Sequence, residues 1–237
     1  MKIVILATEP SGDFLGSKLI QALKKSKKNL IIKGIGGEQM QKVQFNSWIR
    51  ISEFKAIGIY EVLTNLIKYL KLIKYTEKKI RLFSPDIIIS IDSPSFNYRV
   101  LKRLCDLKSK KVKFFHYVAP TVWAWKKYRA KLYANLYDKL FILFKFEKLY
   151  FTKYGLETLY VGHQIFYEKP KINKKKYISF LPGSRTSEIN NNFDEFLLVI
   201  EKCLRNFKDF DYYILTFKNH LDLIKPKLKK YTSKIKI

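Results

Sequence analysis

The chain has 237 residues, 47% of them hydrophobic, and carries a formal net charge of +27 at pH 7. This length allows one large domain, or one domain and part of another. The composition excludes a disordered chain, and no apolar run approaches the ~18 residues of a transmembrane helix. The charge comes from 40 Lys and 7 Arg against 20 acidic residues, which favours anionic partners. A compositional bias typical of an AT-rich coding sequence is an equal explanation.

The first seven residues briefly resemble a signal peptide, but the polar segment 8–13 ends the apolar run too early. We therefore interpret residues 3–7 as a first buried strand. The two cysteines, Cys105 and Cys203, show neither metal-binding nor redox spacing. A reducing cytoplasm is the simplest location for such a chain.

Apolar runs typical of strands alternate with helical patterns along the chain. The predicted strands are 3–7, 30–33, 87–91, 112–117, 140–144 and 159–161. Leu15, Leu19 and Leu23 recur at four-residue steps, and 60–83 is a long amphipathic stretch, so both regions predict covering helices. This alternation indicates an α/β fold with a mainly parallel sheet.

A polar, lysine-rich segment at 169–176 predicts a linker to a second unit. That unit is expected to contain strands at 177–181 and 212–217, a helix reaching about residue 207, and a last helix. Roughly 70 residues are few for an independent parallel α/β domain. We therefore expect one domain at 1–168 and an incomplete second domain at 169–237.

The loop after the first strand contains Glu9, Ser11 and Asp13. In open parallel sheets, ligands bind at the loops that leave the carboxyl ends of the strands. An acid here would oppose a phosphate, so Glu9 and Ser11 fit sugar hydroxyls better than a dinucleotide. The alternative is that Ser11 or Asp13 only caps the helix that follows.

The strand predicted at 87–91 runs directly into Asp92, with Asn97 in the same polar segment. A carboxylate at the end of a buried strand is costly unless it is paired or used. Asp92 is therefore a candidate general base toward a sugar hydroxyl, with Asn97 beside it as a substrate-binding residue. A helix cap or a structural hydrogen bond is the alternative role of Asp92.

The segment 116–125 holds His116, Trp123 and Trp125 directly after a predicted strand. A rigid loop of this composition at a strand end predicts a substrate-binding wall. The alternative is that both tryptophans fill the core. His163 follows Gly162 where the first unit ends, and it either meets substrate or packs against neighbours.

The segment 181–188 follows the first strand of the second unit and opens a helix, with Ser184, Arg185 and Glu188 as candidate binding residues. A glycine, hydroxyl groups, free backbone N–H groups and a guanidinium suit a diphosphate. Arg185 could neutralise a leaving phosphate as its charge develops. A surface arginine beside a capped helix is the alternative.

Taken in order, these segments resemble the lipid-A-disaccharide synthase family. The resemblance is carried by 10–16, 34–37, 57–63, 91–94, 116–125, 161–163 and 181–188. It implies two Rossmann-like domains of the GT-B glycosyltransferase type, with acceptor domain 1–168 and a truncated UDP-sugar domain 169–237. It also implies inverting transfer from UDP-2,3-diacylglucosamine to 2,3-diacylglucosamine 1-phosphate, without a metal or other cofactor.

The resemblance carries two roles onto single residues. Asp92 matches the family aspartate that acts as base on the acceptor 6-hydroxyl, and Arg185 matches the arginine needed for activity, which we assign to the UDP diphosphate. The products would be the β-1,6-linked lipid A disaccharide 1-phosphate and UDP.

Acylated substrates imply work at a bilayer, on the cytoplasmic face of the inner membrane. The lysines and aliphatic residues of 66–83 suit an anionic membrane surface, although a helix that only covers the sheet fits equally. A homo-oligomer is left open. Competing hypotheses are an inactive remnant, another UDP-sugar transferase, and a basic nucleic-acid-binding module. The motifs do not support the last, so no nucleic-acid partner is expected.

Overall fold

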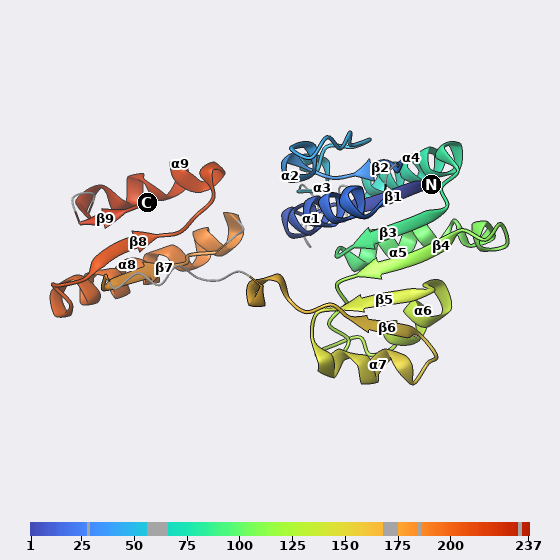
Figure 1. Cartoon of the computed structure of the whole chain (residues 1–237). Coiled ribbons are helices and arrows are strands. Elements are labelled where there is room, and N and C mark those ends of the chain that lie inside the picture. The colour runs from blue at the N-terminus through green and yellow to red at the C-terminus, as the bar shows by residue number, and fades with distance from the viewer. Residues whose placement is uncertain (28, 56–65, 168–174, 184–185, 232–233) are drawn as a thin grey trace. The chain divides into compact units, whose positions relative to one another are not determined.

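The computed structural model describes residues 1–27, 29–55, 66–167, 175–183, 186–231 and 234–237. The chain divides into two compact units, Met1–Glu168 and Lys169–Ile237. Each unit has its own sheet and its own hydrophobic core. The expected fold class, α/β with parallel sheets, is confirmed (Figure 1).

The first unit contains a six-stranded parallel sheet. Its strands are β1 (Lys2–Ala7), β2 (Ile31–Ile35), β3 (Ile87–Ile91), β4 (Lys113–Tyr117), β5 (Lys139–Ile142) and β6 (Glu157–Tyr160), in the order β2-β1-β3-β4-β5-β6. The register places Leu6, Ser90, His116 and Leu140 side by side across four strands. Because β1 and β3 are neighbours but their following connections leave in opposite directions, the topological switch point lies between them.

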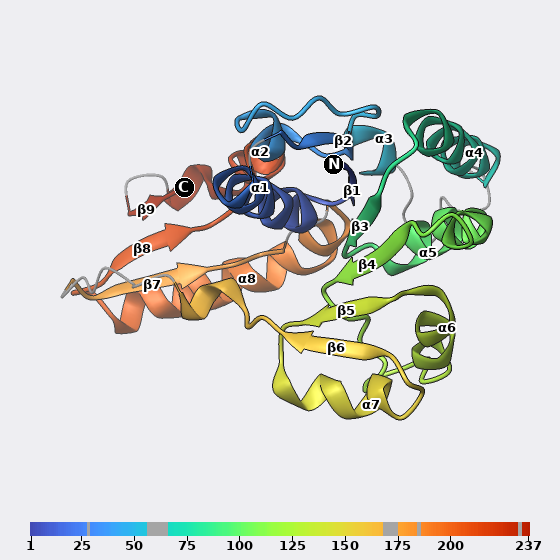
Figure 2. The same cartoon turned by 45° about the vertical axis from the view of Figure 1, so that its right-hand side comes forward.

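Helices cover both faces of this sheet (Figures 1 and 2). One face carries α1 (Pro10–Ser26) and α2 (Glu38–Gln41), and the other carries α4 (Leu66–Phe83), α5 (Pro94–Lys102), α6 (Arg129–Leu136) and α7 (Lys148–Thr152). Shorter elements are α3 (Ser52–Lys55), η1 (Cys105–Lys108), η2 (Lys145–Glu147) and η3 (Gln164–Phe166).

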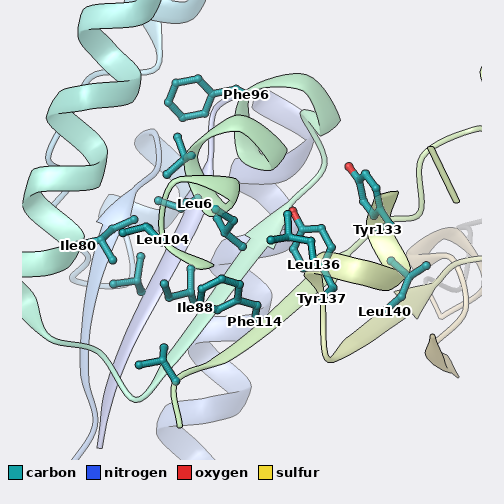
Figure 3. Packing of buried hydrophobic residues seen from close by; sticks show 14 of the residues in the cluster. Leu6, Ile80, Ile88, Phe96, Leu104, Phe114, Tyr133, Leu136, Tyr137 and Leu140 are labelled. Carbon is teal, nitrogen blue, oxygen red and sulfur yellow. The ribbon is translucent and has the colours of Figure 1, made fainter. Parts of the chain in front are cut away.

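The central strands are buried on both sides. Ile3, Ile5 and Ile89 pack with α1, whereas Leu6 and Ile88 face the second layer of helices. Figure 3 shows part of this larger core, in which Ile80, Leu104 and Leu136 pack with the strand residues Ile88 and Phe114. Burial on both faces explains why the sequence shows continuous apolar runs here instead of alternation.

The second unit has three parallel strands in the order β7-β8-β9. Its elements are β7 (Tyr177–Phe180), α8 (Thr186–Asn206), β8 (Asp211–Ile214), η4 (Lys218–His220), α9 (Leu221–Ile224), η5 (Pro226–Tyr231) and β9 (Ile235–Lys236). Phe193 and Ile200 of α8 pack against Phe180 and Ile214 of the strands. The two-residue strand β9 is too short for a hydrophobic pattern to reveal.

Several expected boundaries are corrected. The strand predicted at 140–144 ends at Ile142, because the backbone N–H groups of Leu143 and Phe144 donate to the Glu147 carboxylate instead of extending the ladder. The helix predicted at 60–83 is described from Leu66 onward, and 60–65 lie outside the described residues. Among the helices that the structure describes, none is long and apolar enough to cross a membrane.

Candidate active site

Asp92 is the first residue after β3, at the switch point of the sheet. Its backbone N–H donates to the Tyr117 carbonyl at 2.9 Å, which ties the end of β3 to the end of β4. Asp92 and Ser93 have φ values of 52° and 45°. Two successive non-glycine residues in this left-handed region are uncommon, and each costs roughly 1–3 kcal/mol. Strain of this kind clusters at functional sites.

The Asp92 carboxylate is held by two donors. Its Oδ1 accepts from the Ser93 backbone N–H at 2.8 Å, and its Oδ2 accepts from the Ser11 hydroxyl at 3.0 Å. The side chain is only half-buried, so it remains accessible from solvent. The structural hydrogen bonds that the sequence allowed are therefore present, and they orient the accessible carboxylate.

A hydroxyl network links the loops after β1 and β3. The Ser93 hydroxyl donates to the Glu9 carboxylate at 2.8 Å, and the Thr8 hydroxyl donates to Ser93 Oγ at 2.7 Å. Glu9 and Ser11 thus lie next to Asp92, as a shared substrate site requires. The sequence interpretation missed Thr8 and Ser93. In the sequence, each is recognisable only as a hydroxyl residue that closely follows a predicted buried strand.

The alternative in which Ser11 or Asp13 only caps α1 is wrong. Helix α1 begins at Pro10, and Glu9 makes no side-chain cap hydrogen bond. The buried Asp13 carboxylate instead accepts from the backbone N–H groups of Gly37, Gln39 and Met40 at 2.8–3.0 Å. It caps the neighbouring helix α2, because Pro10 already starts α1 and leaves Asp13 inside its first turn.

Asn97 supports the site from behind instead of facing a substrate. It is fully buried on α5, and its Nδ2 donates to the carbonyls of Asp92 at 2.8 Å and Ile91 at 3.3 Å. Its Oδ1 has no hydrogen-bond partner among the described residues. Direct substrate binding by Asn97 is therefore corrected to a role in fixing the Asp92 backbone.

His116 is also corrected from a substrate contact to a buried residue. It is 0% exposed, and its ring packs against Tyr133 and Tyr137, with centroids 5.0 and 5.1 Å away. Its Nδ1 lies 2.7 Å from Ser90 Oγ. Burial lowers the pKa of His116 to about 3, so the imidazole is neutral at physiological pH. The strand register places it on the face that α5 and α6 cover.

The two tryptophans of the following loop are exposed, Trp123 by 45% and Trp125 by 58%. The alternative in which both fill the core is therefore wrong. Val118 and Lys126 adopt φ values of 75° and 53°, so left-handed residues bracket the loop. Lys126 Nζ lies 4.0 Å from the Trp125 ring centroid. Contact of these rings with a substrate stays a prediction.

His163 is half-buried beyond the end of β6. Its Nδ1 accepts from the Ile165 backbone N–H at 3.2 Å, and its ring stacks on Phe144 with centroids 6.1 Å apart. The packing role is therefore present. Substrate contact by His163 stays a prediction.

The candidate residues of the second unit follow β7 in the chain. Ser184 and Arg185 lie outside the described residues. Gly183 has φ +128°, and a Cβ there would lie 2.8 Å from Glu188 Cβ, so only glycine fits at this position against the start of α8. Among the residues that the structure describes, no group of three or more His, Cys, Asp or Glu side chains is placed to hold a metal ion.

Solved structures define the class of fold. The chain is similar over its whole length to the UDP-GlcNAc 2-epimerase of Neisseria meningitidis bound to UDP-GlcNAc, with a TM-score of 0.68, 11% identity and 71% of that chain covered. The corresponding enzyme of Methanocaldococcus jannaschii, in complex with UDP-GlcNAc and UDP, gives a TM-score of 0.60 at 16% identity, with 73% of it covered. The chain thus has the fold of these GT-B proteins.

Sequence comparison then identifies the family. Residues 3–237 match the family described as Lipid-A-disaccharide synthetase, and the chain belongs to that family. It is 39% identical over 244 residues to the lipid-A-disaccharide synthase of Rickettsia bellii, covering 97% of this chain and 64% of the relative. It is 36% identical to that of Francisella tularensis, covering 100% of this chain and 63% of the relative. The chain therefore spans less than two thirds of these relatives.

Proposed function

We propose that this chain joins UDP-2,3-diacylglucosamine to 2,3-diacylglucosamine 1-phosphate, giving the β-1,6-linked lipid A disaccharide 1-phosphate and UDP. Family membership supports this assignment. The observation that carries it is Asp92, an oriented and accessible carboxylate at the switch point of the first sheet. A requirement for acylated sugar substrates would distinguish this proposal from a transferase that uses acyl-free acceptors.

In the proposed reaction, Asp92 accepts the proton of the acceptor 6-hydroxyl as that oxygen attacks C1 of the donor sugar. The O6–C1 bond forms while the bond from C1 to the UDP oxygen breaks, and UDP leaves with the bonding electrons. Attack from the face opposite the leaving group inverts C1, which yields the β linkage. Asp92 stays fixed during this step, because Ser11 and the Ser93 backbone hold its oxygens.

The sugar hydroxyls are proposed to bind near Glu9 and Ser11, beside Asp92. We assign the diphosphate to the loop of the second unit that contains Ser184 and Arg185, with Glu188 in the first turn of α8. Hydroxyl groups, backbone N–H groups and a guanidinium at a helix start suit this anion. Arg185 would stabilise the charge that develops on the departing UDP.

We also propose that α4 contacts an anionic membrane surface at the cytoplasmic face. Ile73 and Ile80 are buried against the sheet, as the covering alternative expects, yet Leu66, Ile67 and Leu70 are 44–69% exposed. Tyr69 in this first part of α4 packs edge-on against Phe96, four residues after Asp92. The exposed apolar end of a lysine-rich helix therefore lies near the proposed base.

The direct test is product formation by the 237-residue chain, with both acylated substrates in detergent micelles and no added metal. We expect disaccharide 1-phosphate and UDP in equal amounts. If the chain alone is inactive, the C-terminal segment of a relative is added in trans. Activity restored by that segment would place the synthase function in a longer assembly, and no product in either case would favour the inactive remnant and contradict the proposal.

A further inference from the structure

An uninterrupted row of aromatic rings crosses the ends of β4, β5 and β6. The ring centroids of Trp123 and Phe146 are 5.7 Å apart, those of Phe146 and Phe144 are 5.8 Å apart, and His163 lies 6.1 Å from Phe144 and 6.4 Å from Phe166. We call these five residues the aromatic ledge. They come from three loops that are separate in sequence but adjacent at the carboxyl edge of the sheet.

The ledge is open to solvent although it is apolar. Phe144, Trp123, Phe146 and Phe166 are 41%, 45%, 48% and 71% exposed. Exposed apolar neighbours enlarge it: Tyr160, Ile165 and Tyr167. A single exposed ring needs no explanation, whereas a contiguous exposed apolar patch marks a binding surface.

The loops that carry the rings are held in place by hydrogen bonds. Glu147 is 4% exposed, and its carboxylate accepts from the backbone N–H groups of Leu143 and Phe144, which fixes the turn between the two phenylalanines. The Tyr167 hydroxyl donates to the Val161 carbonyl at 3.1 Å and closes the loop around His163. The exposed rings therefore stand on a preorganised support.

Cations border the ledge, and accessible acids do not. The loops 118–128, 143–149 and 161–167, all of them described, contain four lysines and a single acid, the buried Glu147. Lys126 lies over the Trp125 ring and Lys145 over the Tyr160 ring, 4.0 and 5.6 Å from the centroids. An apolar surface with a cationic border matches an amphiphile that has an anionic head and a hydrocarbon chain.

Charge favours an anionic lipid as the occupant of this surface. The lysines at its border, such as Lys126 and Lys145, would neutralise an anionic head group while the rings contact hydrocarbon.

We propose that the aromatic ledge binds an acyl chain of the anionic lipid substrate while its sugar lies at Asp92. This rests on the proposed function and adds the place where the hydrocarbon is held. The ledge begins close to Asp92, because β4 is the direct neighbour of β3 and the Asp92 N–H donates to the Tyr117 carbonyl at the end of β4. From β3 to β6 the strand spacing amounts to about 14 Å, so an extended chain would cross the ledge.

The probe for this proposal is 12-bromododecyl phosphate, used below its micelle concentration, because bromine quenches indole fluorescence on contact. In a Trp48→Phe background only Trp123 and Trp125 emit. We expect saturable quenching. The half-saturation concentration should be at least fivefold higher for neutral 12-bromododecanol, and excess inorganic phosphate should not reverse the quenching. The double variant Phe144→Ser, Phe146→Ser should raise the half-saturation concentration at least tenfold.

The control is Leu149→Ser, which removes an even more exposed apolar side chain, 75% exposed and outside the ring contacts, and should change the half-saturation concentration less than twofold. Absent quenching, or equal loss in both variants, would overturn the proposal. Loss of binding to anionic vesicles with unchanged affinity for the monomeric probe would also overturn it, in favour of a bilayer contact. Asp92→Asn should leave quenching unchanged, so a failure of the proposed catalysis is separable from a failure of the ledge.

Discussion

The two units repeat the same strand-loop-helix pattern but secure it differently. In the first unit, four successive residues of β3 are buried, and two clusters of 24 and eight buried residues fill the two faces. In the second, burial alternates along β8 and one cluster has nine buried residues. The first unit therefore fixes its strand-end loops from both faces, whereas the second relies on local contacts such as Gly183 against Glu188.

This contrast indicates which unit positions its loops more precisely. The Asp92 loop is positioned by side chains 81–85 residues away in the chain, Thr8, Glu9 and Ser11. After β7, Gly183 lies against Glu188 of the helix that directly follows. We expect the first unit to be a rigid platform and the second to open more readily.

The largest effect is expected from Gly34→Ala. A Cβ at Gly34 would lie 1.9 Å from the Ile5 carbonyl oxygen, at φ +145°. The collision is with the central strand β1, so the cost should exceed about 5 kcal/mol and unfold the first unit. All three tryptophans lie in residues 1–168, so their fluorescence reports on this unit alone.

The control is Gly155→Ala, which also has a positive φ, +79°, but whose Cβ would meet nothing within 4 Å. It should cost only about 1 kcal/mol. Native-like tryptophan fluorescence in Gly34→Ala would contradict the close packing of β2 on β1.

Next in size is a pair of identical core truncations, Ile88→Ala in β3 and Ile200→Ala in α8, both fully buried. Each should cost about 2–5 kcal/mol. Ile88→Ala should shift the urea midpoint of tryptophan fluorescence. Ile200→Ala should leave that midpoint unchanged and raise the thiol reactivity of the partly buried Cys203 at least about 30-fold, the equivalent of about 2 kcal/mol. A shift of both signals in both variants would mean that the units unfold as one.

A pH effect of about 2 kcal/mol should come from His116. The pKa of His116 is about 3 in the folded chain and 6.5 in the unfolded chain. Between these values the unfolded chain binds a proton at His116 and the folded chain does not. Stability of the first unit should therefore fall as the pH drops from 7 to 5. Urea unfolding followed by tryptophan fluorescence should show this loss reduced by about 2 kcal/mol in His116→Gln. An equal loss in both proteins would mean that His116 is not buried as described.

The smallest expected effect concerns Ser11, whose hydroxyl donates to Asp92. Ser11→Ala should lower turnover about tenfold, the equivalent of about 1.4 kcal/mol, with unchanged thermal stability of the first unit. Ser26→Ala in the same helix removes a hydroxyl that bonds only locally, to the Leu23 carbonyl, and should leave turnover unchanged. Equal losses would assign the effect to α1 instead of to Asp92.

The sequence predicted the elements that local patterns encode. The strand at 87–91 is confirmed to the residue, because both its faces are buried and Asp92 ends the apolar run. Contacts across the fold could not be predicted in this way. Asp13 caps α2 from 24 residues away, and His116 is buried because of its register beside Ser90. Thr8 and Ser93 became visible as site residues only when the ends of β1 and β3 were brought together.

The most direct test of the central claim compares the chain with its Asp92→Asn variant in the assay for disaccharide 1-phosphate. Asparagine keeps the size of the side chain. Its oxygen can accept from the Ser93 backbone N–H and its NH2 group can donate to the Ser11 hydroxyl, but it cannot take the proton of the acceptor hydroxyl. We predict product from the unmodified chain, at least a thousandfold less from the variant, and the same tryptophan unfolding midpoint for both. Turnover retained by Asp92→Asn would contradict the account and remove Asp92 from the role of base.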